Sequence, residues 1–186
     1  MFSHYSEPRI PAIPDLDKFQ GKVVHSHSYR EPSDYTGLRV LCLGAGPSGV
    51  DICLDISKYA SIVKSNFYNH NKAKKFTDYD VPGVLKANPN GVCLTDGTFR
   101  KIDALIFCTG YIYSYPFLSP NCDITVTDDY VFPLYKHLIN AHKPSMAFLG
   151  LPFLVTPLPL LEFQARFFLH TLLGTVHIPS LDKILK

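Results

Sequence analysis

Apolar runs of strand length alternate with helical spacing in the middle of the chain. Residues 39–43 (RVLCL) and 103–108 (DALIFC) are almost wholly apolar, a pattern typical of parallel strands that are buried on both faces. Apolar residues recur at helical spacing over 48–59, and residues 61–64 predict a further strand. A strand, a tight glycine turn, a helix and a strand make one βαβ unit, so the pattern predicts an α/β fold with parallel strands.

The remainder of the chain predicts shorter elements. An Asp-Gly pair at 96–97 separates two strand-like runs, 91–95 and 98–102, and predicts a β-hairpin. A helix is expected over 159–173, beginning at a proline. Further expectations are a short strand at 23–24, a hairpin around 128–129, a strand at 145–150 and a final helix capped by Ser180, with extended or irregular chain at 1–17, 29–36 and 68–90.

Composition narrows the class of protein. The chain has 186 residues, of which 46% are hydrophobic and 18% charged, as expected of a globular domain with a core. A net charge of +2 gives no reason to expect nucleic acid or an anionic membrane as a partner. Prolines and charges interrupt the most apolar stretch, 146–173, so no membrane span is expected, and no secretory leader is visible. The five cysteines form no C-x-x-C, which excludes a zinc knuckle, predicts no metal site, and favours reduced thiols in the cytoplasm.

A glycine-rich loop follows the strand at 39–43 and opens the predicted helix. Its sequence is Gly44-Ala45-Gly46-Pro47-Ser48-Gly49, a G-x-G-x-x-G pattern. In such a loop the first glycine permits a sharp turn, the second lets a pyrophosphate approach the backbone, and the third allows close helix–strand packing. The helix N-terminus and the hydroxyl of Ser48 would add to phosphate binding. A chance glycine cluster in a βα turn is the alternative, but the flanking strand and helix favour dinucleotide binding.

The end of the second strand bears on the choice of nucleotide. An NAD site has an acidic residue about 20 residues beyond the loop, whereas this chain has Lys64, Ser65 and Asn66 there. A lysine and a serine would accept the 2′-phosphate that a carboxylate would repel, so the sequence favours NADP(H). Nearby lysines, which more simply form a solvated loop face, are Lys72, Lys74 and Lys75.

A second motif precedes the glycine loop. Residues 19–29 (FQGKVVHSHSY) fit F-x-G-x-x-x-H-x-x-x-Y. In this order the two motifs resemble the flavin-containing monooxygenase family, particularly its insect senecionine N-oxygenase-like branch, as do residues 148–152 and 162–166. The motif histidine, His25, is expected to tie a domain junction by hydrogen bonds rather than to transfer protons.

The resemblance implies an NADPH- and FAD-dependent enzyme that oxygenates nitrogen or sulfur in a small-molecule nucleophile. In such proteins the cofactors carry the chemistry, so no catalytic side chain is assigned. The run Thr109-Gly110-Tyr111 resembles the point at which the chain returns to the FAD domain, and it places Thr109 and Gly110 beside the flavin nucleotide. The glycine loop then corresponds to the NADP(H) site.

The chain departs from the family in ways that lead to further expectations. Its 186 residues hold one G-x-G-x-x-G loop, whereas the family also has an FAD fingerprint ahead of the part that matches here. Asn66 or Phe67 matches the position where the family often has a basic residue. We therefore expect a fragment that is inactive alone, with strand 105–107 and helix 163–173 lacking the sheet on which they pack.

The predicted organisation is a Rossmann-like NADP(H)-binding domain at 37–102, inserted in a partial FAD-binding domain formed by 1–36 and 103–186. Two other functions stay open at this point. One is a non-catalytic NADP(H)-binding or interaction module. The other is a flavoprotein disulfide reductase, which the missing C-x-x-C disfavours.

Overall fold

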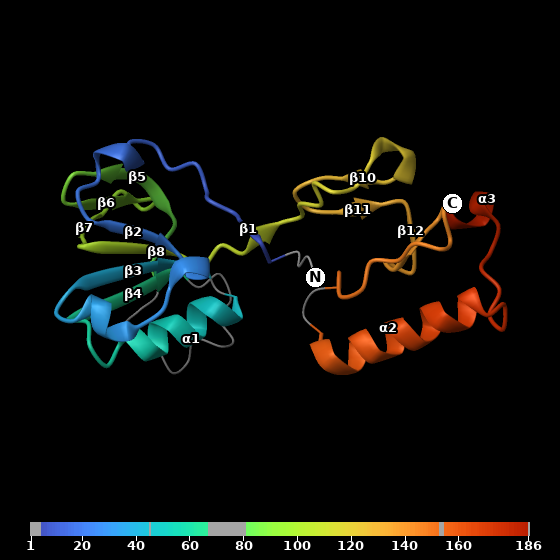
Figure 1. Ribbon diagram of the computed structural model, residues 1–186. Coiled ribbons are helices and arrows are strands. Elements are labelled where there is room, and N and C mark those ends of the chain that lie inside the picture. Colours follow the sequence, from blue (N-terminus) through green and yellow to red (C-terminus); the bar gives the residue numbers. More distant parts are fainter. Residues whose placement is uncertain (1–4, 45, 67–80, 153–154, 186) are drawn as a thin grey trace. The chain divides into compact units, whose positions relative to one another are not determined.

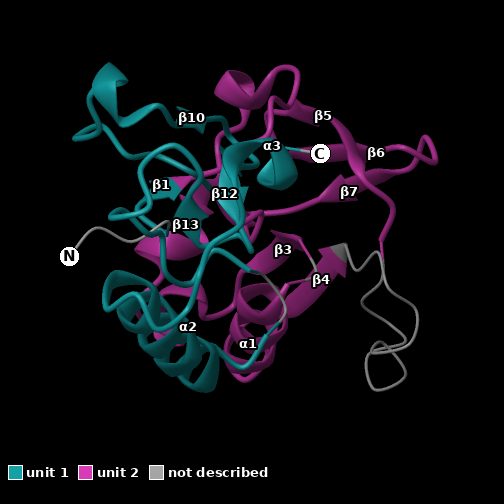
Figure 2. Cartoon of the chain, turned by 90° about the vertical axis from the view of Figure 1, so that its right-hand side faces the viewer, with its two compact units in different colours: residues 1–7, 112–186 teal, residues 8–111 magenta. Residues whose placement is uncertain are grey.

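The computed structural model describes residues 5–44, 46–66, 81–152 and 155–185 (Figure 1). The chain forms two compact units, which Figure 2 shows in different colours. Unit 1 consists of residues 1–7 and 112–186, and unit 2 consists of residues 8–111. The chain crosses between them within β1 (Glu7–Pro8) and β9 (Tyr111–Ile112). The predicted domain boundaries at 36/37 and 102/103 were assigned by the cofactor that each part would bind, whereas the two units are defined by contacts within the chain. The predicted domains therefore stay a prediction.

A parallel sheet forms the centre of unit 2. Its strands are β2 (Lys22–His25), β8 (Ala104–Phe107), β3 (Arg39–Leu43) and β4 (Ile62–Asn66), in that spatial order. Helix α1 (Pro47–Ile56) makes the crossover from β3 to β4. The α/β class and the predicted βαβ unit are thus confirmed.

Both faces of this sheet are covered, because β3 carries apolar side chains at every position from Val40 to Leu43. Val40 and Cys42 pack in one core cluster with Ile52 and Ile56 of α1. Leu41 and Leu43 pack in a second cluster on the opposite face. The strand is therefore a continuous apolar run rather than an alternating one.

An antiparallel sheet supplies the second cluster. It consists of β5 (Val84–Asn88), β6 (Gly91–Leu94) and β7 (Phe99–Lys101), and its buried Ala87, Val92 and Leu94 contact the side of β3 away from α1. The predicted Asp-Gly hairpin joins β6 to β7. Strand β5 contradicts the expectation of irregular chain at 68–90, because a register shift and exposed polar positions hide its pattern in the sequence.

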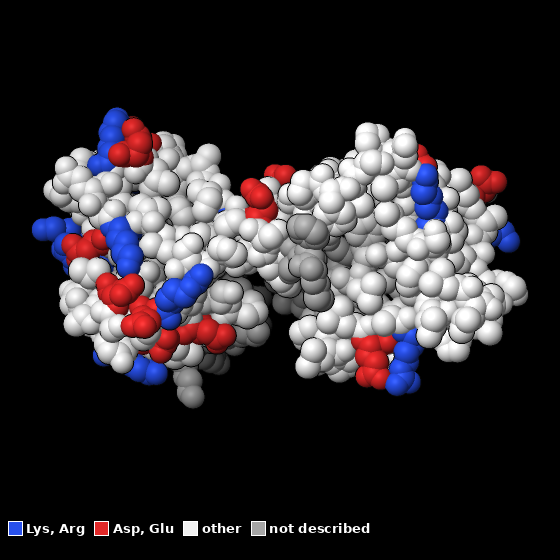
Figure 3. Space-filling model, viewed as in Figure 1, with Lys and Arg blue, Asp and Glu red and all other residues white. Residues whose placement is uncertain are grey.

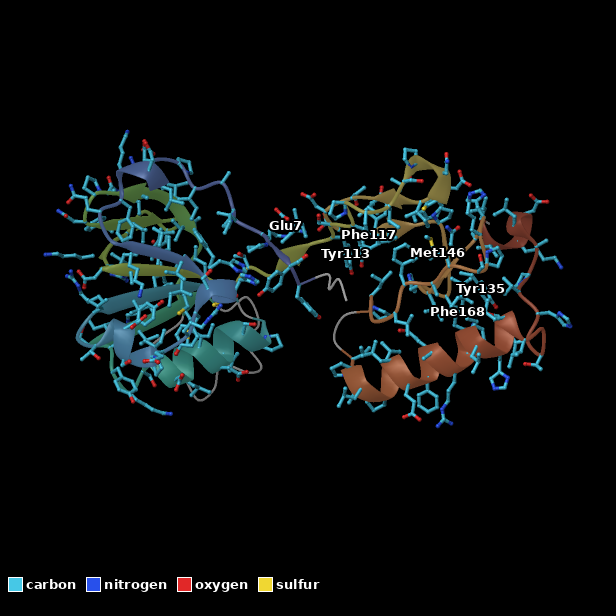
Figure 4. The ribbon with its side chains drawn as sticks, viewed as in Figure 1. Glu7, Tyr113, Phe117, Tyr135, Met146 and Phe168 are labelled. Carbon is cyan, nitrogen blue, oxygen red and sulfur yellow. The ribbon has the colours of Figure 1, made fainter. Side chains whose placement is uncertain are left out.

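Unit 1 is built from short strands and one long helix. Its strands form two antiparallel pairs, β10 (Thr125–Val126) with β11 (Val131–Phe132) and β12 (Leu134–Tyr135) with β13 (Ile139–Asn140). The first pair confirms the predicted hairpin around 128–129. Figure 4 shows Phe168 pointing from helix α2 (Pro157–Leu172) towards the strands of this unit.

The remaining helices are short. Helix α3 (Leu181–Ile184) follows Ser180, which occupies the N-cap position without a side-chain capping bond. The 3-10 turns are η1 (Leu16–Lys18), η2 (Ser26–Ser28), η3 (Pro32–Tyr35) and η5 (Pro120–Cys122). None of the helices within the described ranges is long and apolar enough to cross a membrane.

Three expectations were wrong or only partly right. The predicted strand at 145–150 is a loop with a single bridge, Ala147 to Ile139, because Pro144 and Pro152 restrict its backbone. Strand 105–107 does not lack partners, since β8 lies between β2 and β3 and is fully buried. Helix α2 does expose apolar side chains as expected, although it begins at Pro157 rather than Pro159.

Candidate functional site

Two glycines of the loop are required by close packing. Gly44 has a φ of +112°, and a Cβ placed there would lie 2.2 Å from the carbonyl oxygen of Cys108. A Cβ at Gly49 would lie 2.2 Å from the carbonyl oxygen of Gly44. The loop therefore packs directly on the end of β8 and beneath the first turn of α1, an arrangement that no larger residue permits.

The middle glycine, Gly46, is not required by packing. A Cβ at Gly46 would have no atom of the described residues within 4 Å, its chain neighbours apart, and the backbone there is extended, with φ −71° and ψ 177°. Gly46 is the N-cap of α1, Pro47 begins the helix, and no side chain caps it. Among the described residues, space is thus left next to Gly46 at the positive end of the helix, where an anion such as a pyrophosphate would be stabilised.

The carboxyl end of β4 lies beside this loop in the parallel sheet. Ser65 pairs with Cys42 in register and shares its face, so its side chain lies on the α1 side of the sheet. It is fully buried, and its hydroxyl has no hydrogen-bond partner among the residues that the structure describes. A buried polar group of this kind normally has a partner, so this hydroxyl fits a site that a ligand or water completes.

Two more of the residues predicted to bind the nucleotide, Lys64 and Asn66, belong to β4. Lys64 is half-buried in β4. The predicted residues outside the described part of the chain are Ala45, Phe67, Lys72, Lys74 and Lys75, together with the side chain of Asn66.

Thr109 and Gly110 are held where β8 ends. The backbone N–H of Cys108 donates to the carbonyl of Leu43 at 2.6 Å, which fixes this end of β8 against the glycine loop. The Thr109 hydroxyl donates to the carbonyl of Arg9, and the Arg9 amide donates to the carbonyl of Gly110 at 2.9 Å. The structure therefore brings the predicted Thr109-Gly110 turn close to the loop of Gly44.

The histidine and tyrosine of the second motif bind two different elements. His25 Nε2 lies 3.0 Å from the carbonyl oxygen of Gly110, while His25 Nδ1 accepts from the backbone N–H of His27. The Tyr29 hydroxyl donates to the carboxylate of Asp55 on α1 at 2.8 Å. Burial lowers the pKa of His25 and raises that of Tyr29. His25 thus makes hydrogen bonds of the kind predicted for it, and its role at a domain junction stays a prediction.

Metal ligation finds no support in the same region. No group of three or more His, Cys, Asp or Glu residues suited to a metal ion occurs among the described residues. All five cysteines are free thiols.

Sequence reasoning missed two contributors to this site. Arg9 acts through its backbone amide and carbonyl, which no side-chain motif can reveal. Asp55 accepts a hydrogen bond from Tyr29, which lies 26 residues earlier in the sequence. The position of Asp55 on the helix does not predict a partner so far away in the chain.

Comparisons with known proteins bear on the whole chain. The family described as Flavin-binding monooxygenase-like matches residues 2–68 and 81–186. The senecionine N-oxygenase of Tyria jacobaeae is 36% identical over an alignment of 192 positions, which covers 98% of this chain and 41% of that protein. The flavin-containing monooxygenase FMO GS-OX-like 2 of Arabidopsis thaliana is also 36% identical, with the same coverage.

Solved structures agree with these relatives. The S-allyl-L-cysteine S-oxygenase of Allium sativum superposes with a TM-score of 0.84 at 33% identity, covering 97% of this chain and 43% of that one. Tmm from Pelagibacter sp. strain HTCC7211 gives 0.85 at 27% identity, covering 97% and 42%. The chain thus spans about two fifths of the length of each.

Proposed function

Because the chain belongs to the flavin-binding monooxygenase-like family, we propose that its loop Gly44–Gly49 binds the pyrophosphate of NADP(H). In this proposal residues 37–102 form the nucleotide-binding domain, and residues 1–36 and 103–186 are parts of an FAD-binding domain. The observation that carries it is the open space beside Gly46 at an uncapped helix N-terminus, between two glycines that packing requires. The unpartnered Ser65 hydroxyl at the same sheet edge supports the fit.

The proposed reaction of the whole protein is oxygenation of nitrogen or sulfur in a small molecule. Bound NADPH would supply the reducing equivalents, and bound FAD would activate oxygen. The names of two relatives, a senecionine N-oxygenase and an S-allyl-L-cysteine S-oxygenase, support this substrate class. In this proposal the chain's own residues bind and orient the cofactors. Thr109 and Gly110 would lie beside the flavin nucleotide, and their hydrogen bonds with the Arg9 backbone support this role by fixing the turn.

Nucleotide preference tests the proposal. Lys64 stands where an NAD site has an acid, so NADPH is expected to bind more tightly than NADH, by a modest factor because no arginine fork is present in the described part of the site. Calorimetric titration of the folded chain with both nucleotides measures the ratio. Lys64→Glu should reverse the preference, whereas Lys101→Glu on β7 should leave it unchanged. Equal or tighter binding of NADH by the unaltered chain would refute the assignment.

A further inference from the structure

The ring of His25 is fixed in one protonation state by its two hydrogen bonds. His25 Nδ1 accepts from the backbone N–H of His27 at 3.0 Å, so this nitrogen carries no proton. A carbonyl oxygen can only accept, so the contact of 3.0 Å between Nε2 and Gly110 requires the proton on Nε2. The structure therefore assigns the neutral Nε2–H tautomer to His25.

Protonation of His25 is incompatible with this arrangement. A second ring proton on Nδ1 would face the His27 N–H, placing two donors against each other. The ring is 7% exposed and lies edge-on to Tyr111, with centroids 5.2 Å apart, so it has little room to turn away. The charged ring still has its Nε2–H for Gly110, so the conflict arises only at Nδ1. It can be relieved by a shift of the η2 turn or by a rotation of the ring, and rotation would carry Nε2 off the Gly110 carbonyl.

The Gly110 carbonyl is two residues from the glycine loop's contact with β8. Gly110 has a φ of +77°. Its carbonyl oxygen accepts hydrogen bonds from His25 Nε2 and from the backbone N–H of Arg9. The carbonyl of Cys108 lies against Gly44, and the Cys108 amide donates to Leu43. A displacement at Gly110 would thus pass along Thr109 and Cys108 to the glycine turn that is proposed to hold the nucleotide.

We propose that His25 is a positioning residue for the dinucleotide site, and that protonation of its ring weakens nucleotide binding. The proposal rests on the proposed function of the glycine loop. His25 touches no nucleotide atom in this scheme; it acts by holding the Thr109-Gly110 turn against the loop. Acidic conditions would then release the nucleotide by loosening that turn.

The groups that face His25 set the direction of its titration. Burial lowers its pKa below the usual 6.5, the Gly110 carbonyl raises it, and the charge of His27 lowers it. Tyr111 contributes a neutral ring edge, and Phe107, which pairs with His25 in register, contributes no charge. Arg9 reaches the same carbonyl through its backbone. A depressed pKa places the loss of binding below pH 6.5, as pH falls towards the pKa of the folded state.

The first experiment compares NADP+ binding by the unaltered chain and by His25→Gln, at about pH 8 and about pH 5.5. Glutamine offers an N–H near the position of Nε2 and does not titrate, so His25→Gln should bind like the unaltered chain at the higher pH. Once the pH has fallen through the depressed pKa of His25, the unaltered chain should have lost about five-fold more affinity than the variant, the equivalent of one hydrogen bond. The 2′-phosphate of NADP+ titrates near pH 6, and its effect on affinity is the same for both proteins, so it cancels when they are compared.

Two controls separate the possible outcomes. His27→Gln keeps the backbone N–H and should retain the pH dependence, displaced to higher pH because the charge of His27 no longer lowers the pKa of His25. His25→Leu should bind weakly at both pH values. Equal pH dependence in the unaltered chain and a folded His25→Gln would overturn the inference alone. Failure of the unaltered chain to bind NADP+ at about pH 8 would overturn the proposed function with it.

A second measurement needs no substitution. Nitrogen NMR of the imidazoles should show the Nε2–H tautomer of His25, and saturating NADP+ should lower its pKa further, because binding and protonation oppose each other reciprocally. A His25 titration that NADP+ leaves unchanged would overturn the inference.

Discussion

Individual glycines of the loop are constrained for different physical reasons. Gly44 and Gly49 face backbone oxygens at distances that exclude a side chain, and Gly44 also has a left-handed φ. Gly46 has an ordinary extended backbone and empty space where a side chain would lie. Packing therefore explains the first and third glycines of the motif, and the proposed nucleotide would explain the second.

Substitution at the two kinds of position should give opposite results. Gly46→Val should fold, with a cost of about 1 kcal/mol from the poorer N-cap, but should bind NADP+ at least ten-fold more weakly, because the branched side chain fills the space for the pyrophosphate. Gly44→Ala should instead lower the free energy of unfolding by about 3 kcal/mol through strain and overlap. Calorimetry measures the first effect and thermal denaturation the second. Unchanged affinity in a folded Gly46→Val chain would show that phosphate binds elsewhere.

At the scale of elements, an ion pair fastens the amino ends of β3 and β8. Arg39 Nε donates to Asp103 Oδ2 at 2.7 Å, its second guanidinium nitrogen bonds the other carboxylate oxygen, and its backbone N–H also reaches Oδ2. These bonds lower the pKa of Asp103 to about 2. Both side chains are partly exposed, so solvent screening reduces the stabilisation.

Asp103→Asn tests this clamp. Since the pKa is depressed in the folded state, the stabilisation is complete above pH 3.8 and is lost as pH falls through about 2. At neutral pH the variant should be less stable by about 1 kcal/mol after allowance for screening. Urea titrations of both proteins across this pH range should converge at the acid end, and Asp51→Asn on the exposed side of α1 should have little effect. A difference that persists undiminished at low pH would argue that packing, not charge, is lost.

At the scale of the whole molecule, unit 1 leaves much of α2 uncovered. Gln164 is buried and accepts from the Gly150 amide at 2.8 Å, which holds one face of the helix against its unit. Other positions are exposed and apolar, including Leu158 at 78% and Phe163 at 71%. Figure 3 shows few charged side chains on the visible face of unit 1, whereas both signs are interspersed on unit 2. Apolar exposure of this extent favours association in water.

The 186-residue chain is therefore expected to have poor solubility and to retain no FAD. Its sequence has one strand–glycine loop–helix unit, which the proposed function assigns to NADP(H). Purification with added FAD, followed by a visible spectrum, measures flavin retention. A stoichiometric flavin band that NADPH bleaches would contradict this expectation, and NADP(H) binding without flavin would agree with the alternative of a non-catalytic binding module. Replacing Leu158 and Phe163 by lysine should improve solubility without lowering the melting temperature.

The sequence by itself determined the local elements whose signals lie within a few residues. The buried strand at 39–43, the glycine turn, α1 and the Asp-Gly hairpin could be predicted because apolar spacing and turn chemistry act over short distances. The location of the proposed nucleotide site also follows from a local signal, the G-x-G-x-x-G between a strand and a helix, and the site itself stays a prediction.

Tertiary structure decided what depends on contacts across the chain. Only folding places β8 between β2 and β3, buries the Ser65 hydroxyl, and brings the Arg9 backbone and the His25 ring to one carbonyl. Strand β5 and the loop at 145–150 were mispredicted because pairing partners, not local propensity, determine whether a short segment becomes a strand. Backbone groups and distant partners leave no pattern in the sequence, so these parts of the site become visible only when the chain is folded.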